Sequence, residues 1–117
     1  MTRSLLWIFA ALFMAGCGAS FPVPNERIAS SEAAVRGADE VGARNDPRAA
    51  LHLKLAQEDI TKAKALVQDG DNQRADTVLL RGQTEAELAI SLAREAVAKA
   101  EAQQAAETAA KIKAGGQ

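Results

Sequence analysis

Small apolar side chains recur every three or four positions from residue 25 to residue 113, and this pattern is interrupted at two places. The spacing puts the apolar residues on one face of an α-helix. Both interruptions, residues 42–47 and residues 69–71, are rich in the residue types that end or begin helices. The sequence therefore predicts an all-α domain over residues 25–114, in which a short helix is followed by a long antiparallel αα-hairpin.

The helix boundaries follow from individual cap and turn residues. We expect Asn25 to cap the first helix and Gly42 to end it. Asp46 followed by proline predicts the start of the second helix, because proline fits the first helical position. Gly70 and Asp71 then predict a tight turn between two antiparallel helices.

The third helix is predicted to be the longest and the richest in alanine. It runs from about residue 72 to residue 113, and residues 115–117 form a disordered tail. Its length is about 63 Å, against about 35 Å for the second helix. Either the first helix covers part of this excess, or the C-terminal end projects alone. Pairs of opposite charge four residues apart are expected on its solvent side: Arg81 with Glu85, Glu95 with Lys99 and Glu107 with Lys111.

The residues expected to face the core share the same spacing. In the first helix they are Ile28, Ser31, Ala34, Val35, Ala38 and Val41. In the second they are Leu51, Leu55, Ile60, Ala63, Leu66 and Val67, with Ala56 at the edge. In the third they are Ala75, Val78, Leu79, Gly82, Ala86, Ala89, Leu92, Ala93, Ala96, Val97 and Ala100. Beyond these residues the stripe is almost all alanine, which favours a helix but buries little area.

Residues 1–16 have the features of a signal peptide. One arginine precedes an uncharged run over residues 5–15, which as a helix is only about 16 Å long, against about 30 Å of membrane hydrocarbon. The run ends in Met-Ala-Gly-Cys at residues 14–17, which resembles the lipobox of bacterial lipoproteins. We therefore expect cleavage between Gly16 and Cys17 and lipidation of the Cys17 thiol. The alternatives are an ordinary secretory signal with an incidental cysteine, and an uncleaved N-terminal anchor.

Residues 17–24 are interpreted as the lipid anchor and a proline-containing tether. Pro22 and Pro24 favour an extended backbone, so the folded part starts close to the membrane surface. In lipoprotein families, aspartate after the lipidated cysteine favours retention in the inner membrane, and here that residue is Gly18. We therefore expect the outer membrane, with the protein facing the periplasm, in preference to the inner membrane.

The composition argues against several classes of function. A net charge of −1 offers no basic face for nucleic acid, and the helical region contains no aromatic residue for stacking. His52 is the only histidine, and no second ligand completes a metal site. We expect no catalytic, metal-binding or cofactor-binding residues. His52 is interpreted as an ordinary, partly exposed helix residue, and Glu58 and Asp59 as part of a solvated surface.

Several features together resemble one family. They are the lipobox at residues 14–17, the prolines of the tether, Val41-Gly42-Ala43, the proline-led helix with Leu55-Ala56 and Ala63-Lys64-Ala65-Leu66, the Gly70 turn, and the third helix with Ala86, Leu88 and Leu92-Ala93. This layout is similar to DUF4398, small bacterial lipoprotein domains of unknown function. The resemblance implies a helical lipoprotein of the cell envelope, and it brings no catalytic residue to this chain.

Two functions remain as expectations. The first is a lipid-anchored scaffold or adaptor that contacts an envelope protein, or a second copy of itself, through its helices. The second is a periplasmic ligand-binding or transport-accessory lipoprotein with a cavity between the helices. In both, the acylated Cys17 binds membrane lipid. An enzyme is not expected.

Overall fold

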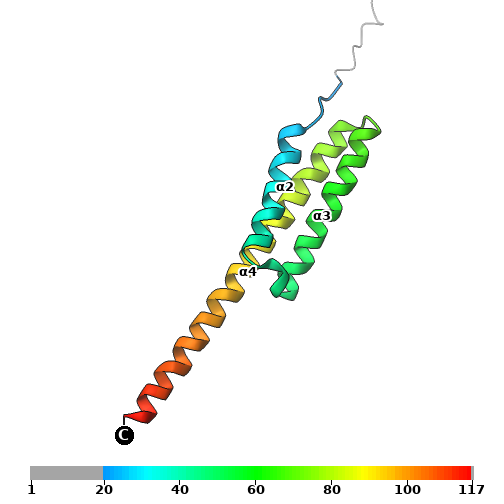
Figure 1. Ribbon diagram of the computed structural model, residues 1–117. Helices are drawn as coiled ribbons and strands as arrows, with labels where there is room; N and C mark the ends of the chain where they lie inside the picture. The colour runs from blue at the N-terminus through cyan, green and yellow to red at the C-terminus, as the bar shows by residue number, and fades with distance from the viewer. Residues whose placement is uncertain (1–19, 117) are drawn as a thin grey trace, which may run out of the picture.

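The computed structural model describes residues 20–116, so Gly16, Cys17 and the predicted signal peptide lie outside the described residues. The described chain consists of helix α2 (Asn25–Glu40), a short 3₁₀ turn η1 (Ala43–Asn45), helix α3 (Pro47–Gln68) and helix α4 (Asn72–Gly115) (Figure 1). No strand occurs within residues 20–116. The prediction of an all-α fold is confirmed: a short helix precedes a long hairpin, and the third helix is the longest and is rich in alanine.

Two glycines and two aspartates set the boundaries between the helices. Gly42 and Gly70 both have a φ of 80°, a left-handed conformation that glycine adopts readily and that ends a helix. The Asp46 carboxylate accepts hydrogen bonds from two backbone N–H groups in the first turn of α3, each at 3.0 Å. The Asp71 side chain caps α4 by accepting one hydrogen bond, from the Arg74 N–H at 3.3 Å. These four predicted boundaries are confirmed.

The predicted cap at Asn25 is wrong, because Asn25 is the first residue of α2 and Pro24 occupies the cap position without a side-chain hydrogen bond. The Ile28 N–H donates to the Pro24 oxygen at 3.0 Å, which is the ordinary first hydrogen bond of the helix. Of the N–H groups in the first turn, that of Asn25 is satisfied by the Val23 backbone oxygen at 2.9 Å. At the other end of the chain, α4 includes Gly115 and so extends one residue beyond the predicted domain. The preceding strong helix formers outweigh the low helix propensity of one glycine.

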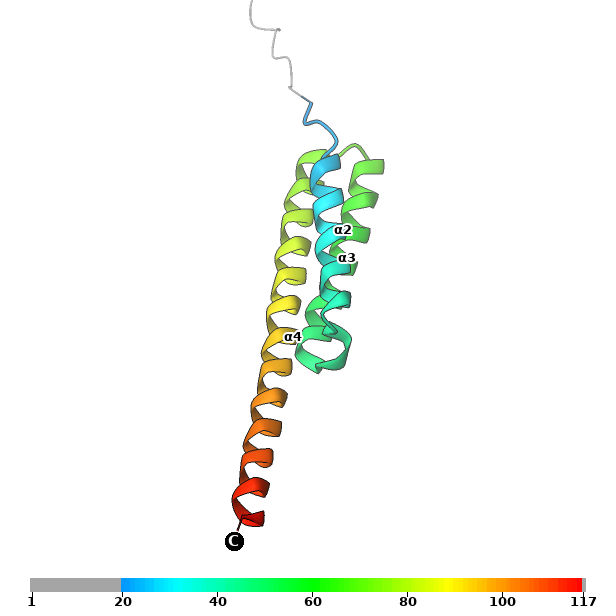
Figure 2. The same cartoon turned by 60° about the vertical axis from the view of Figure 1, so that its left-hand side comes forward.

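The three helices form a bundle in which α2 and α4 run in one direction and α3 runs in the other (Figure 1 and Figure 2). The start of α2 and the turn between α3 and α4 therefore lie at the same end. We call this end, formed by residues 20–27 and 66–74, the tether end. α4 packs against both other helices, with its most extensive interface against α3.

The core of the bundle consists mainly of alanine. Leu53 and Leu79 are the largest side chains that are almost fully buried. The buried alanines are Ala38, Ala43, Ala49, Ala56, Ala63, Ala75, Ala86, Ala89 and Ala93. Side chains this small let the helix axes approach closely. At Gly82 a Cβ would lie 3.3 Å from the Ala56 carbonyl oxygen, so the backbones of α3 and α4 are nearly in contact there.

The face of α3 that meets the core differs from the predicted stripe. Leu51 and Leu55 were expected in the core, but they are 54% and 36% exposed. Leu53 occupies the core instead, between the fully buried Ala49 and Ala56. Both sets follow the three-or-four spacing of a helix. The set with alanine lies inside because close packing against α4 leaves no room for a row of leucines.

The predicted core face of α4 is confirmed from Ala75 to Ala93, and Ala96 is still partly buried. The prediction is wrong for Val97 and Ala100, which are exposed. Every residue from 97 to 116 is exposed. α2 lies beside the same part of α4 as α3 does, since Ser31 in α2 donates to the Leu79 oxygen at 3.1 Å. The excess length of α4 therefore projects alone beyond η1 (Figure 1 and Figure 2). We call residues 97–116 the C-terminal projection.

Candidate functional site

The site residues predicted from the sequence, Gly16 and Cys17, lie outside the described residues. The structure describes the chain from residue 20 onward, three residues after Cys17. It therefore shows how the segment that follows the cysteine is attached to the bundle. Two features of the described chain bear on function: the tether end and the C-terminal projection.

The tether is bonded to the bundle at the start of α4. The Asn72 side-chain nitrogen donates a hydrogen bond to the backbone oxygen of Phe21 at 2.8 Å. Pro24 is buried, whereas Phe21 and Val23 are 42% and 44% exposed. The buried Asn72 side-chain oxygen finds no hydrogen-bond partner among the described residues. The chain is thus attached to the bundle from Phe21 onward, and two apolar side chains remain at the surface.

At the tether end, an ion pair joins α2 to α4. The Arg27 Nε lies 2.5 Å from an Asp76 carboxylate oxygen, and both side chains are partly buried. Beside it, an open groove of about 720 Å³ is lined by the tether, by the first turns of α2 and by Asp76. The tether forms the apolar wall of this groove and the helices form its polar wall. This mixed lining offers no enclosed apolar pocket of the kind that binds small molecules.

A second ion pair crosses the interface between α3 and α4. The Arg81 Nε donates to the Asp59 carboxylate at 2.6 Å, and a second guanidinium nitrogen bonds the other carboxylate oxygen. Asp59 is buried, so the prediction that it belongs to a solvated surface is wrong, whereas its neighbour Glu58 is exposed. The hydrogen bonds and the charge of Asp59 raise the pKa of the Arg81 guanidinium. The contact joins the two helices of the hairpin.

His52 in α3 pairs with Glu85, which lies one turn beyond Arg81 in α4. The His52 Nδ1 lies 2.6 Å from a Glu85 carboxylate oxygen, and both side chains are about three-quarters buried. His52 is partly exposed, as predicted, but it lies in contact with an acid.

The predicted pairing of Arg81 with Glu85 along α4 is wrong, because both side chains bond across to α3. The pair of Glu95 with Lys99 is confirmed.

A fourth contact joins α2 to α3. The Lys64 Nζ lies 2.6 Å from a Glu32 carboxylate oxygen. This hydrogen bond, and then the charge of Lys64, lower the pKa of the Glu32 carboxyl. Each of these four contacts joins two different helices. Within residues 20–116, no group of three or more His, Cys, Asp or Glu residues is placed to hold a metal ion.

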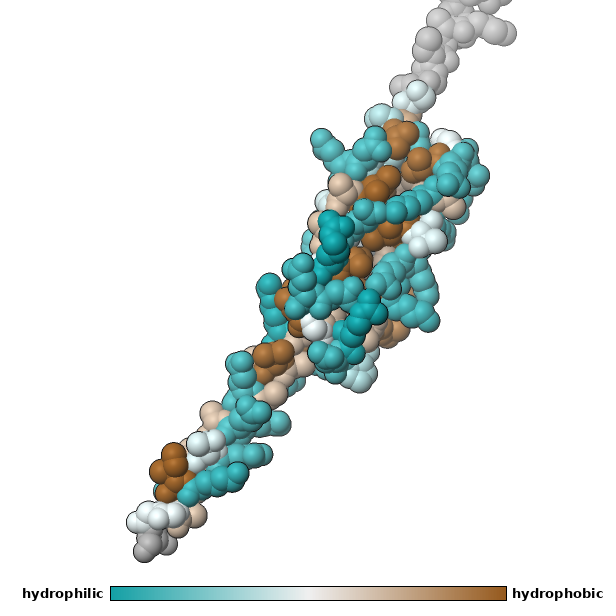
Figure 3. Space-filling model, viewed as in Figure 1, coloured by the Kyte–Doolittle hydropathy of each residue, from teal (hydrophilic) through white to brown (hydrophobic). Residues whose placement is uncertain are grey.

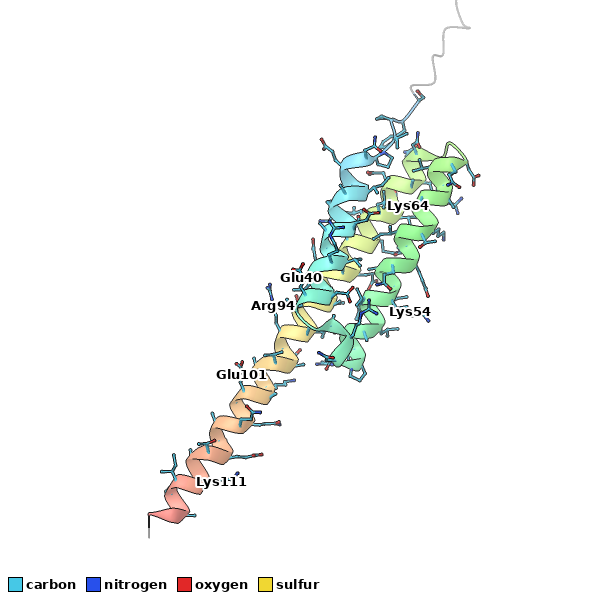
Figure 4. All side chains as sticks on the ribbon, in the orientation of Figure 1. Glu40, Lys54, Lys64, Arg94, Glu101 and Lys111 are labelled. Carbon is cyan, nitrogen blue, oxygen red and sulfur yellow. The ribbon has the colours of Figure 1, made fainter. Side chains whose placement is uncertain are left out.

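The C-terminal projection carries an apolar row along one side. The row consists of Ala98, Ala102, Ala105, Ala109 and Ile112, which alternate in spacing between four and three. Ile112 is 71% exposed. Charged residues, including Glu101 and Lys111, lie along the same helix (Figure 4). Apolar and polar side chains are interspersed over this part of the surface (Figure 3). No described helix is long and apolar enough to cross a membrane.

The fold and these surfaces define an all-α domain with a three-helix bundle and a projecting helix. The chain belongs to the family DUF4398, a domain of unknown function, whose model matches residues 26–105. The match covers α2, η1, α3 and α4 as far as the middle of the C-terminal projection. No curated protein and no solved structure matches the chain.

The ion pair between α3 and α4 could have been predicted from the sequence, although the spacing of apolar residues does not indicate it. Asp59 and Arg81 are each eleven residues from Gly70. In an antiparallel hairpin, residues equally far from the turn lie opposite each other, so opposite charges at these positions are expected to meet. The apolar row on the projection could also be predicted from its spacing. That no other described helix covers the row follows only from where α2 and α3 end.

Proposed function

We propose that this protein is a bacterial lipoprotein of the outer membrane that faces the periplasm and acts as a scaffold or adaptor. Cys17 carries the lipid after cleavage of the bond between Gly16 and Cys17, and the C-terminal projection is the contact surface. The observation that carries the proposal is the exposure of every residue from 97 to 116 in a continuous helix. Such a role needs no catalytic group.

Helix physics explains why a lone helix can serve this role. Starting an isolated helix in water is costly, because the first turn fixes several residues for a single hydrogen bond. The projection avoids that cost, since it continues a helix that the bundle has already formed. Its alanines add the best helix propensity and admit close approach of a second helix. A partner helix thus meets a surface that is already ordered, which reduces the entropy lost on binding.

The positions of the two ends fit an adaptor. α4 begins at the tether end with Asn72 and has 44 residues, which correspond to about 66 Å. The projection lies at the opposite end from the tether (Figure 1 and Figure 2). A lipid on Cys17 therefore holds one end at the membrane, while the contact surface is presented at a distance from it.

A ligand-binding role has less support. It requires an enclosed, mostly apolar cavity. The bundle core is filled with alanine, and the grooves at the tether end and beside Asp59 and Arg81 open to solvent. Close helix packing of this kind favours a structural role over a binding pocket.

The anchor is tested by the variant Cys17→Ala, compared with the unchanged protein in fractionated cells. We expect the unchanged protein in the outer-membrane fraction and labelled by radioactive palmitate. The variant is expected to lose the label and to leave the outer membrane. A variant that remains in the membrane with its signal uncleaved would show that residues 5–15 are the anchor. Recovery of the unchanged protein in the inner membrane would refute the proposed location.

The contact surface is tested by placing a photo-crosslinking amino acid at Ala105 in intact cells. The control position is Lys54, which is exposed on α3 and lies outside the projection (Figure 4). We expect a discrete crosslinked product from Ala105 and none from Lys54. A product of twice the protein's own mass identifies a second copy as the partner. The same products from both positions, or none from Ala105, would contradict the adaptor role.

A further inference from the structure

Phe21 is the only aromatic residue among residues 20–116, and it does not lie in the core. It lies at the tether end with Val23, and both side chains remain more than two-fifths exposed. Phe21 and Val23 both line the open groove at the tether end, so the two residues lie close together. Exposed apolar side chains that lie together mark a contact surface more often than singly scattered ones do.

The short distance from Cys17 indicates that the surface formed by Phe21 and Val23 contacts the membrane. Three residues separate Cys17 from Phe21. Four Cα-to-Cα steps span at most about 15 Å. The headgroup region on each side of a bilayer is roughly 5–8 Å deep. A lipid on Cys17 therefore brings Phe21 and Val23 to the membrane surface.

The charges at the tether end exclude attraction to acidic lipid as the cause of such a contact. The exposed acids Glu26, Asp69 and Asp71 outnumber the exposed base Arg74. Arg27 is already paired with Asp76. The contact that this end offers to a bilayer is therefore apolar, and it does not depend on anionic headgroups.

We infer that Phe21 and Val23 insert into the surface of the bilayer that holds Cys17, and that this second contact keeps α4 pointing away from the membrane. The inference rests on the proposed lipidation of Cys17. The tether transmits the orientation, because Asn72 bonds the Phe21 carbonyl and the Val23 carbonyl bonds the start of α2. A lipid alone would leave the bundle able to lie flat on the membrane.

The mature chain offers a clean test, since Trp7 is the only tryptophan and lies in the predicted signal peptide. The lipidated variants Phe21→Trp and Ile112→Trp each carry one tryptophan after cleavage. Each is reconstituted into phosphatidylcholine vesicles whose acyl chains carry bromine, a quencher of tryptophan fluorescence. We expect Phe21→Trp to lose most of its intensity relative to vesicles without bromine, and Ile112→Trp to lose none. High salt and added phosphatidylglycerol should leave this difference unchanged.

The outcomes separate this inference from the anchor itself. Flotation of the vesicles on a density gradient shows whether the protein is attached. If the protein floats but Phe21→Trp is not quenched, the second contact is refuted while the lipid anchor stands. Quenching of both variants would show that the bundle lies flat, which also refutes the inference. The variant Val23→Trp repeats the measurement at the second residue, and circular dichroism confirms that each variant keeps its helices.

Discussion

At the scale of single residues, the informative side chains are the polar ones at the edge of the alanine core. Asp59 is buried beside Gly82, where a Cβ would lie 3.1 Å from the Asp59 Cβ. A carboxylate so placed is stable only when a cation reaches it, and Arg81 supplies that cation from the solvent side. We expect the pair to favour the observed register of α3 against α4, because a different alignment would leave the acid unpaired.

The variant Arg81→Ala is expected to lower the free energy of unfolding by about 1–2 kcal/mol, because it leaves a buried carboxylate without its partner. We take the lower part of the usual range, since the Arg81 side chain is more than half exposed. Urea unfolding followed by circular dichroism measures the change. The double variant with Asp59→Ala should recover part of the loss. An equal loss in Lys54→Ala, which breaks an exposed pair with Glu58, would contradict this account.

At the scale of the helices, the contact between α3 and α4 depends on the absence of a side chain at one position. Gly82 faces the Ala56 carbonyl oxygen, whereas Gly37 in α2 faces only the flexible end of Ile90, at 3.6 Å from a built Cβ. Both glycines lie inside helices, where alanine is the better helix former. Replacing each glycine by alanine therefore distinguishes two effects on stability: the gain in helix propensity, which both variants share, and the space available for the new methyl group, which differs between them.

Gly37→Ala is expected to raise the free energy of unfolding by roughly 0.5–1 kcal/mol, since the new methyl group fits and the helix gains propensity. Gly82→Ala should gain less or lose stability, and Gly82→Leu should lose about 1–3 kcal/mol because it forces the two backbones apart. Thermal and urea unfolding of the three variants give the comparison. Equal stabilisation by both alanine variants would mean that α3 and α4 are not in close contact at Gly82.

The helix boundaries were readable from the sequence because caps and left-handed glycines act locally. Asp46, Gly42 and Gly70 each indicate a helix boundary from local sequence alone. The core face of α3 was not readable, because Leu51 and Leu53 both fit the helical period and only packing against α4 selects between them. A hydropathy-based choice favours the set with more leucines, whereas close packing favours the set with alanines.

At the scale of the whole molecule, the bundle and the C-terminal projection are separate in their energetics. The described residues that are buried lie between residues 24 and 93, so the projection adds nothing to the core. The greater length of α4 was evident from the sequence, which left open whether the first helix covers part of the excess or the C-terminal end projects alone. That this part meets no other helix became clear only from the end positions of α2 and α3. The predicted lipid site lies outside the described residues, so it stays a prediction from its motif.

Ending the chain after Ala100 is therefore expected to leave the midpoint of thermal unfolding unchanged. The helical circular dichroism signal should fall in proportion to the residues removed. Ending the chain after Leu88 is the matched control, because it also removes the buried Ala89 and Ala93 and should lower the midpoint. If the chain that ends after Ala100 unfolds at a lower midpoint than the full chain, the projection supports the bundle.

Because α4 passes from the bundle into the projection without a break, the direction of the projection is set by the packing of α4 inside the bundle. A lone helix curves only gently along its length, so the projection keeps that direction to its tip. A small tilt of α4 within the bundle is therefore carried to the tip as a displacement that grows with the number of residues beyond the bundle.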